Sequence, residues 1–96
     1  HLTAICFLKV IKVDRFAFCG CEQLYQVFLP VCQELGAGCF GACKNVKILD
    51  LPRVKIVGLY QFQGCSSLTY LSIPLVEQIG RSCFCGCDSM ESVDSQ

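Results

Sequence analysis

Charge is scarce in this sequence, and neither sign is in excess. Eight Lys and Arg residues balance eight Asp and Glu residues, which gives a formal net charge of zero. Proteins that bind nucleic acids take much of their affinity from basic groups that neutralise phosphates, and anionic membranes attract basic clusters. We therefore expect no nucleic-acid partner and no polybasic membrane patch. No apolar run approaches the roughly 18 residues of a membrane span, so we also expect no membrane insertion.

Histidine is nearly missing as well. The one histidine, His1, stands at the first position. A nucleophilic cysteine or serine needs a nearby base or an electropositive pocket, and the carboxylates are scattered as on a solvated surface. We therefore predict no enzyme activity, no catalytic residue and no cofactor. A chain that opens on His1 instead of Met is expected to be a fragment or a processed form.

Cysteine, by contrast, is abundant, with ten in 96 residues. Such a density normally indicates a secreted disulfide scaffold. Four of the cysteines nevertheless recur at one position of a repeat, which favours a ladder of buried thiols, even though adjacent Cα atoms of a parallel ladder lie near disulfide range. A structural zinc site usually needs two pairs of ligands, and the run Cys83-x-Cys85-x-Cys87 does not supply them. We therefore expect reduced thiols and no metal site.

The remaining cysteines fall at less regular positions. Cys32 occupies a valine position and is expected in the core. The position shared by Cys39 and Cys83 also holds an alanine and a glutamine, Ala17 and Gln61, which predicts a half-exposed site. Two more, Cys19 and Cys85, are expected on the surface.

The chain repeats itself every 22 residues. The repeat is defined by columns of phenylalanine, cysteine, aliphatic residues and proline, which include Phe18, Phe40, Phe62 and Phe84; Cys21, Cys43, Cys65 and Cys87; Val27, Leu49, Leu71 and Val93; and Pro30, Pro52 and Pro74. A fixed period of this length is the signature of a stacked array, because one unit alone cannot bury its apolar face.

The structure of one unit can be predicted from its residue types. Leu71 and Ile73 alternate with outward residues, which is the period of a strand with one buried face. Pro74 ends that strand because it cannot donate to a ladder. Gly80 suits a backbone position with positive φ. The segment 81–87 then reads as one short helical turn that points an aromatic ring and a thiol inward at i and i+3.

We therefore predict an α/β-type repeat solenoid with parallel β-sheet rungs and short helical turns, in about four repeats. The whole chain, 1–96, is expected to form a single leucine-rich repeat domain. Its repeats are expected at 2–23, 24–45, 46–67 and 68–89, followed by a partial repeat at 90–96.

The pattern Ile79-Gly80-x-x-Cys-Phe84-x-Gly-Cys87-x-x-Met90-x-x-Val93, preceded by Leu68-x-x-Leu71-x-Ile73-Pro74, resembles the BspA-like leucine-rich repeat. The resemblance implies a curved solenoid with a parallel sheet on its concave side. It also implies a cell-surface or secreted protein of adhesion type that binds other proteins, whereas reduced cysteines would favour the cytoplasm.

The stretch Gly36-Ala-Gly38-Cys-Phe-Gly41 formally matches the G-x-G-x-x-G signature of dinucleotide-binding folds. The same positions of the next repeats read Gly58-Leu-Tyr-Gln-Phe-Gln and Gly80-Arg-Ser-Cys-Phe-Cys. We interpret the match as a coincidence inside the repeat, because a chain made of repeats leaves no room for a dinucleotide-binding fold.

What remains as a candidate site is a surface. The positions at the start of the main strand, and those between its inward residues, place aromatic and aliphatic groups on neighbouring rungs of one face. Aromatic groups on a rigid platform are typical binding anchors. The predicted protein-binding residues are Tyr25, Gln26, Phe28, Lys47, Ile48, Asp50, Thr69, Tyr70 and Ser72.

Two functions are compatible with a repeat solenoid that presents such a face. The first is a protein-binding solenoid, as a surface or adhesion-type interaction module. The alternative is a structural fragment of a longer repeat protein that self-associates through its open ends. That alternative rests on the terminal rungs, because neither end carries the polar cap that keeps a solenoid soluble, and a free strand edge is ready to pair.

Overall fold

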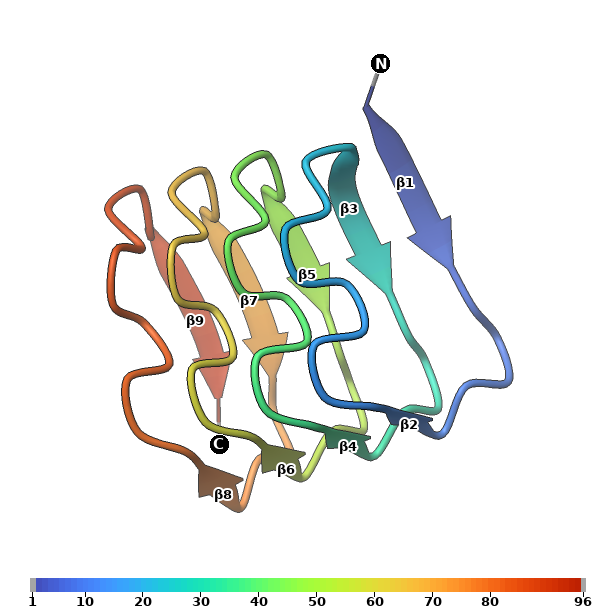
Figure 1. The fold of residues 1–96 in the computed structure, drawn as a ribbon. Coiled ribbons are helices and arrows are strands. Elements are labelled where there is room, and N and C mark those ends of the chain that lie inside the picture. The colour runs from blue at the N-terminus through green and yellow to red at the C-terminus, as the bar shows by residue number, and fades with distance from the viewer. Residues whose placement is uncertain (1, 96) are drawn as a thin grey trace.

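The computed structural model describes residues 2–95, which wind into a solenoid of β-strands (Figure 1). Each turn of the chain contributes one longer strand, one strand of two residues, and an irregular turn segment that leads to the next longer strand. The strands are β1 (Thr3–Cys6), β2 (Lys12–Val13), β3 (Leu24–Phe28), β4 (Glu34–Leu35), β5 (Ile48–Asp50), β6 (Ile56–Val57), β7 (Tyr70–Ile73), β8 (Gln78–Ile79) and β9 (Ser92–Ser95).

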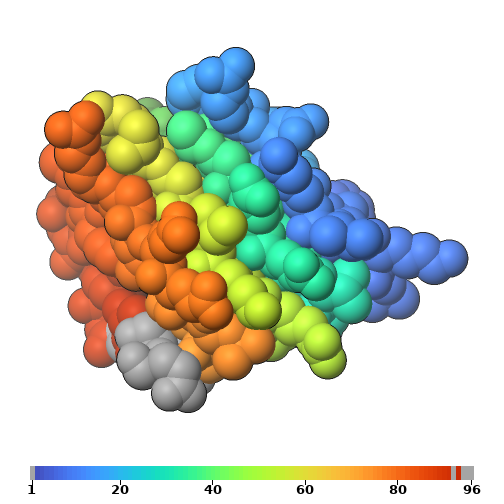
Figure 2. All heavy atoms as spheres, turned by 90° about the horizontal axis from the view of Figure 1, so that it is seen from below, coloured from blue at the N-terminus to red at the C-terminus, as the bar shows by residue number. Residues whose placement is uncertain are grey.

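The strands form two parallel sheets along the solenoid. The longer strands pair in the order β1-β3-β5-β7-β9, and the short strands pair in the order β2-β4-β6-β8. In the first sheet Val27 pairs with Leu49, which pairs with Leu71. Both pairings join residues 22 positions apart, as the repeat predicted, whereas Thr3 pairs with Leu24, 21 positions away, where the register shifts between Thr3 and Ala4. Successive rungs run side by side as diagonal bands across the surface (Figure 2).

The third side of each rung is an irregular turn, and the predicted helical turn over 81–87 is wrong. Within residues 2–95 the structure contains no helix. The backbone N–H groups of Phe62 and Gly64 donate to the carbonyl groups of Cys83 and Cys85 on the next rung, at 3.0 and 2.8 Å. Because these backbone groups bond between rungs, they are not available for the i→i+4 pattern of a helix.

The predicted positive φ of Gly80 is also wrong, and its glycine has another cause. A Cβ atom built on Gly80 would lie 2.6 Å from the backbone nitrogen of Leu59, and one on Gly58 would lie 2.6 Å from that of Ala37. This column therefore needs glycine because successive rungs approach too closely here for a side chain. Positive φ angles occur inside the turn segments instead, for example at Gly64, with a φ of 78°.

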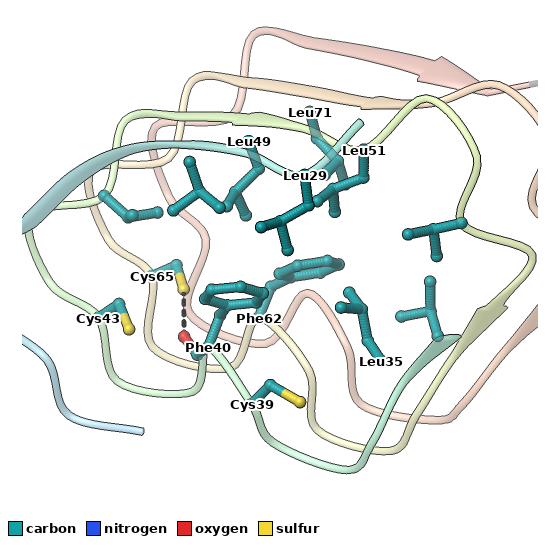
Figure 3. Close-up of a cluster of buried hydrophobic side chains, with 14 of the residues drawn as sticks. Leu29, Leu35, Cys39, Phe40, Cys43, Leu49, Leu51, Phe62, Cys65 and Leu71 are labelled. Carbon is teal, nitrogen blue, oxygen red and sulfur yellow. Dashed lines mark hydrogen bonds between the residues drawn. The ribbon is translucent and has the colours of Figure 1, made fainter. Parts of the chain in front are cut away.

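The core lies between the longer strands and the turn segments. Leucine side chains of the main sheet point toward the rings of Phe40 and Phe62, which come from the turns (Figure 3). Both rings are fully buried. Ring stacking pairs Phe18 with Phe40 at 5.5 Å between centroids, and Phe62 with Phe84 at 5.7 Å. Burial of this kind is the main source of stability in a repeat protein without disulfides.

The cysteine column forms a ladder of hydrogen bonds between rungs. The Sγ–H groups of Cys43, Cys65 and Cys87 donate to the carbonyl oxygens of Phe18, Phe40 and Phe62 at 3.1, 3.0 and 3.0 Å. Figure 3 shows the central bond of this series. Each thiol therefore fills a small buried space and also satisfies a carbonyl on the preceding rung.

All ten cysteines lie within the described residues and are unpaired. Desolvation by burial raises the pKa of Cys65 from its ordinary value near 9 to about 12. The same cause raises the pKa of Cys39 and that of Cys43 to about 11. These thiols therefore stay protonated, which keeps them able to donate and makes them poor nucleophiles.

The position of Cys39, Gln61 and Cys83 is buried, so the prediction of a half-exposed site is wrong there. Each thiol donates to the carbonyl of the glycine three residues earlier, at 2.9 Å. Gln61 uses both ends of its amide, accepting from the Phe40 N–H at 3.2 Å and donating to the Gly36 carbonyl. Polar groups are tolerated because each finds a backbone partner. Cys19 and Cys85 are exposed, as expected, and Cys32 is buried in the core.

Candidate protein-binding face

The outer face of β3, β5 and β7 holds the predicted binding residues. Inward residues such as Leu49 and Leu71 are fully buried, so the residues between them point away from the core. The first outward row is Gln26, Ile48 and Tyr70, which pair in register across the three strands. Gln26 is exposed, Ile48 is half-buried, and Tyr70 is 38% exposed.

The second outward row is Phe28, Asp50 and Ser72, again in register. Phe28 and Asp50 are half-buried, but Ser72 is only 7% exposed. Ser72 was expected to be a contact residue, and it offers almost no surface. The row therefore presents an aromatic ring beside a carboxylate.

A third row lies at the start of the strands and consists of Tyr25, Lys47 and Thr69. Backbone bonds fix these positions, because the Lys47 N–H donates to the Tyr25 carbonyl at 2.8 Å, and the Thr69 N–H donates to the Lys47 carbonyl at 3.0 Å. The Thr69 hydroxyl also donates to that carbonyl at 3.2 Å. Lys47 is exposed, whereas Tyr25 and Thr69 are half-buried.

Together the three rows make a mixed surface. Phe28, Ile48 and Tyr70 lie on adjacent strands, where directly opposite and diagonal side chains are within contact range of one another. Lys47 and Asp50 add one charge of each sign, at opposite ends of β5. Such a surface of apolar and aromatic groups with few charges resembles the centre of a protein–protein interface.

A second surface feature, on the turn segments, was not predicted. A groove of about 260 Å³ is lined by Phe16, Cys19, Gly38, Gly41, Ala42, Tyr60, Gln63 and Gly64. A signal for it was present in the repeat, because aligned rungs place a glycine, Gly38, between two aromatic residues of the same column, Phe16 and Tyr60.

The described residues offer no assembled metal ligands. Among them, no group of three or more His, Cys, Asp or Glu side chains lies close enough to hold a metal ion. In the same part of the chain, no helix is long and apolar enough to cross a membrane.

The family model described as BspA type leucine rich repeat region (6 copies) matches residues 2–96. No curated protein and no solved structure was found to match the chain.

Proposed function

Because the chain belongs to the BspA type leucine-rich repeat family, we propose that it is a protein-interaction module whose ligand contacts the outer face of β3, β5 and β7. Solenoids of this kind build extended binding surfaces from the outward positions of stacked rungs. Leucine-rich repeats are typically binding scaffolds without catalytic activity. The 22-residue units that begin at residues 2, 24, 46 and 68 are the proposed building blocks of this single domain.

The observation that carries the proposal is the register of the outward rows. Phe28, Ile48 and Tyr70 belong to strands whose backbones are fixed by the ladder on both sides, so the three side chains form a rigid platform. A rigid aromatic anchor loses little conformational entropy when it binds. The proposed contact set also includes Tyr25, Gln26, Lys47, Asp50 and Thr69, and Ser72 lies among these residues with only 7% of its surface exposed.

Display selection tests this proposal without a known ligand. Small protein domains from a display library are selected on the folded chain, and each selected binder is then measured against Tyr70→Ala and Ile48→Ser. Removing an anchor at the centre of an interface costs about 2 kcal/mol or more, which is roughly 30-fold in Kd. We expect that loss for both variants.

The matched control is Ile56→Ser on β6, which removes an aliphatic side chain from the other sheet; Ile56 is 37% exposed, close to the 38% of Tyr70. It should leave Kd unchanged. Binders that depend on Ile56 and tolerate both changes on the main sheet would contradict the proposed face.

The finer form of this proposal is an adhesion-type role at a cell surface. It is supported by the family resemblance. Soluble collagen, fibronectin and laminin serve as probes in surface plasmon resonance. The role predicts saturable binding to at least one of them that Tyr70→Ala weakens, and binding to none of the three would count against it.

Self-association is the second candidate, favoured by one observation. The rung that leads into β9 exposes an apolar hollow of about 210 Å³ lined by Ile73, Ile79, Phe84, Cys87, Met90 and Val93. A second copy that covers this surface would remove apolar area from water. Sedimentation across a concentration series should then show species above monomer mass, and Ile79→Lys should abolish them. Monomer at all concentrations would exclude this function for the polypeptide.

A further inference from the structure

The groove on the turn segments arises because one rung lacks side chains where its neighbours carry them. On the second rung the three outward positions of this turn are Gly38, Gly41 and Ala42. On the first rung the corresponding side of the groove is Phe16, and on the third rung it is Tyr60. Two aromatic residues, two rungs apart, therefore line the groove on either side of the small residues of the second rung.

The floor and one wall are in close contact. A Cβ atom built on Gly38 would lie 2.6 Å from Cε1 of Phe16, so the ring lies over this glycine. A Cβ atom on Gly41 would lie 3.6 Å from the Tyr60 carbonyl and 3.9 Å from the Cys19 sulfur. Glycine at position 38 leaves the space that the Phe16 ring occupies, and glycine at position 41 adds no side chain to the groove.

Two positions of the turn have positive φ on every rung, and residues at both positions line the groove. Non-glycine residues rarely adopt positive φ, and a bulky residue there is an outlier. Within residues 2–95 four non-glycine residues do so, and three of them, Phe16, Ala42 and Tyr60, line this groove, with φ of 57°, 57° and 56°. The positive φ therefore belongs to the turn of the repeat itself. Here it aims two aromatic side chains outward, where Phe16 is 58% and Tyr60 41% exposed.

We propose that this groove is a second binding site, which takes one uncharged aromatic ring, of the kind that a tryptophan of a partner protein presents. Its volume of about 260 Å³ is below the range of drug-sized ligand sites, roughly 300–1,000 Å³, and suits a single ring system. Offset and edge-to-face contacts with two aromatic walls favour a planar aromatic ring over a saturated one.

The electrostatics of the groove restrict the ligand further. No charged residue lines it, so a carboxylate or ammonium group would lose its hydration without gaining a counter-charge. The lining residues that carry polar side-chain groups are Gln63, Tyr60 and Cys19. An indole N–H can donate to the Gln63 amide oxygen, which fits tryptophan better than phenylalanine.

This site is separate from the proposed binding face. The groove belongs to the turn segments that precede β3, β5 and β7, whereas the binding face consists of residues within and at the start of those strands. A ligand of the groove therefore tests nothing about the strand residues, and the two proposals can fail independently.

The test is a titration of the ¹⁵N-labelled chain with indole, followed by amide chemical shifts. We expect saturable shifts at the amides of Gly38, Gly41 and Gly64. Tyr60→Ser should weaken indole binding at least tenfold, and Phe16→Ser should do the same. Serine is suitable because Ser82 occupies this column on the next rung, with a φ of 59°. Two exposed aromatic walls give two independent variants, and retained shift dispersion shows that each is folded.

The matched control is Leu59→Ser, which removes the exposed side chain next to Tyr60 without changing the lining of the groove. It should bind indole as the unchanged chain does. Cyclohexanol, benzoate and methyl glucoside serve as saturated, charged and sugar-ring probes, and each should bind at least tenfold more weakly. Absence of indole shifts at the three glycines, shifts confined to the last rung, or equal binding of any of the three probes would overturn the proposal.

Discussion

Replacing Gly58 with alanine should destabilise the solenoid far more than the addition of one methyl group suggests. The new Cβ atom would lie 2.6 Å from the nitrogen of Ala37 and 2.8 Å from the carbonyl carbon of Gly36. Both are backbone atoms of the preceding rung, so no side-chain rotation relieves the contact. The two rungs must separate locally.

The magnitude follows from that separation. An ordinary contact begins near 3.4 Å, so the Cβ atom must move by 3.4 − 2.6 = 0.8 Å. The hydrogen bond from the Gly58 N–H to the Leu35 carbonyl, now 2.9 Å, would stretch to about 3.7 Å, which is too long for a hydrogen bond. The neighbouring hydrogen bond from the Gly38 N–H to the Leu59 carbonyl, at 2.8 Å, joins the same two rungs one residue further along and would stretch as well. Each buried polar group that loses its partner costs about 1–3 kcal/mol, so we expect a loss of about 4 kcal/mol.

Urea unfolding followed by far-ultraviolet circular dichroism measures this loss, and Gly20→Ala is the matched control. Gly20 has a φ of 74°, and a Cβ atom there would meet nothing within 4 Å. Gly20→Ala should therefore lower the free energy of unfolding only by the backbone strain of an alanine in the left-handed region, about 1–2 kcal/mol. Equal losses for the two variants, or a loss below about 2 kcal/mol for Gly58→Ala, would refute the close-approach explanation.

Three further outcomes can be measured on the same material. Phe62→Ala should lower the free energy of unfolding, measured in urea, by about 3–5 kcal/mol. Phe84→Ala should lower it clearly less, because that ring is already 39% exposed. Equal losses would contradict the assigned core. Ala42→Gly should raise the free energy of unfolding by up to about 1 kcal/mol, because Ala42 adopts a φ of 57° at a position where the other rungs have glycine. A lower free energy of unfolding would show that the methyl group of Ala42 stabilises the fold more than its backbone strain destabilises it. A thiol reagent at pH 8 should label Cys65 only after unfolding. Burial raises the pKa of Cys65 in the folded state to about 12, so the stability that this thiol contributes is complete below pH 9 and is lost as the pH rises toward 12. The urea midpoint of the unchanged chain minus that of Cys65→Ala should therefore fall between pH 9 and pH 12. A difference that rises over this range would contradict the sign.

The inward columns of the main sheet could be predicted from sequence because two periods agree there. Leu71 and Ile73 alternate with outward residues, and the same alternation returns after 22 residues, which leaves one consistent register. The structure confirms that register in the pairing of Leu49 with Leu71. Residue type alone was enough, because burial of one face decides the pairing.

The turn segments could not be predicted in the same way. Phe84 and Cys87 are three residues apart, which suits a helical turn and also suits an inward-facing irregular turn. The difference lies in where the backbone N–H groups bond, and here the Gly64 N–H finds the Cys85 carbonyl of the next rung. No local pattern reveals a partner that lies about 20 residues away. For the same reason the sequence does not reveal why position 80 needs glycine, which is the close approach of the preceding rung.

The candidate face was predictable in outline, since the outward positions of a strand follow once the inward ones are known. The burial of Ser72 was not, because the exposed area of a short side chain depends on the sizes of its neighbours. The groove was missed for a related reason. Along the chain Gly38 belongs to a stretch that matches a nucleotide-binding signature, whereas its effect depends on Phe16 and Tyr60 on the rungs before and after it.

These observations separate what holds the solenoid together from what it presents. The rungs are joined by backbone hydrogen bonds, by inward apolar columns and by thiols that donate to the preceding rung. Tyr70 on the strand face and Tyr60 on the turn face take no part in those contacts through their side chains, and both are about two-fifths exposed. Exposed substitutions away from caps and cores usually change stability little. Changing either tyrosine should therefore alter binding at its own surface while the urea midpoint stays nearly constant, and a large fall in the midpoint would mean that the surface also holds the rungs together.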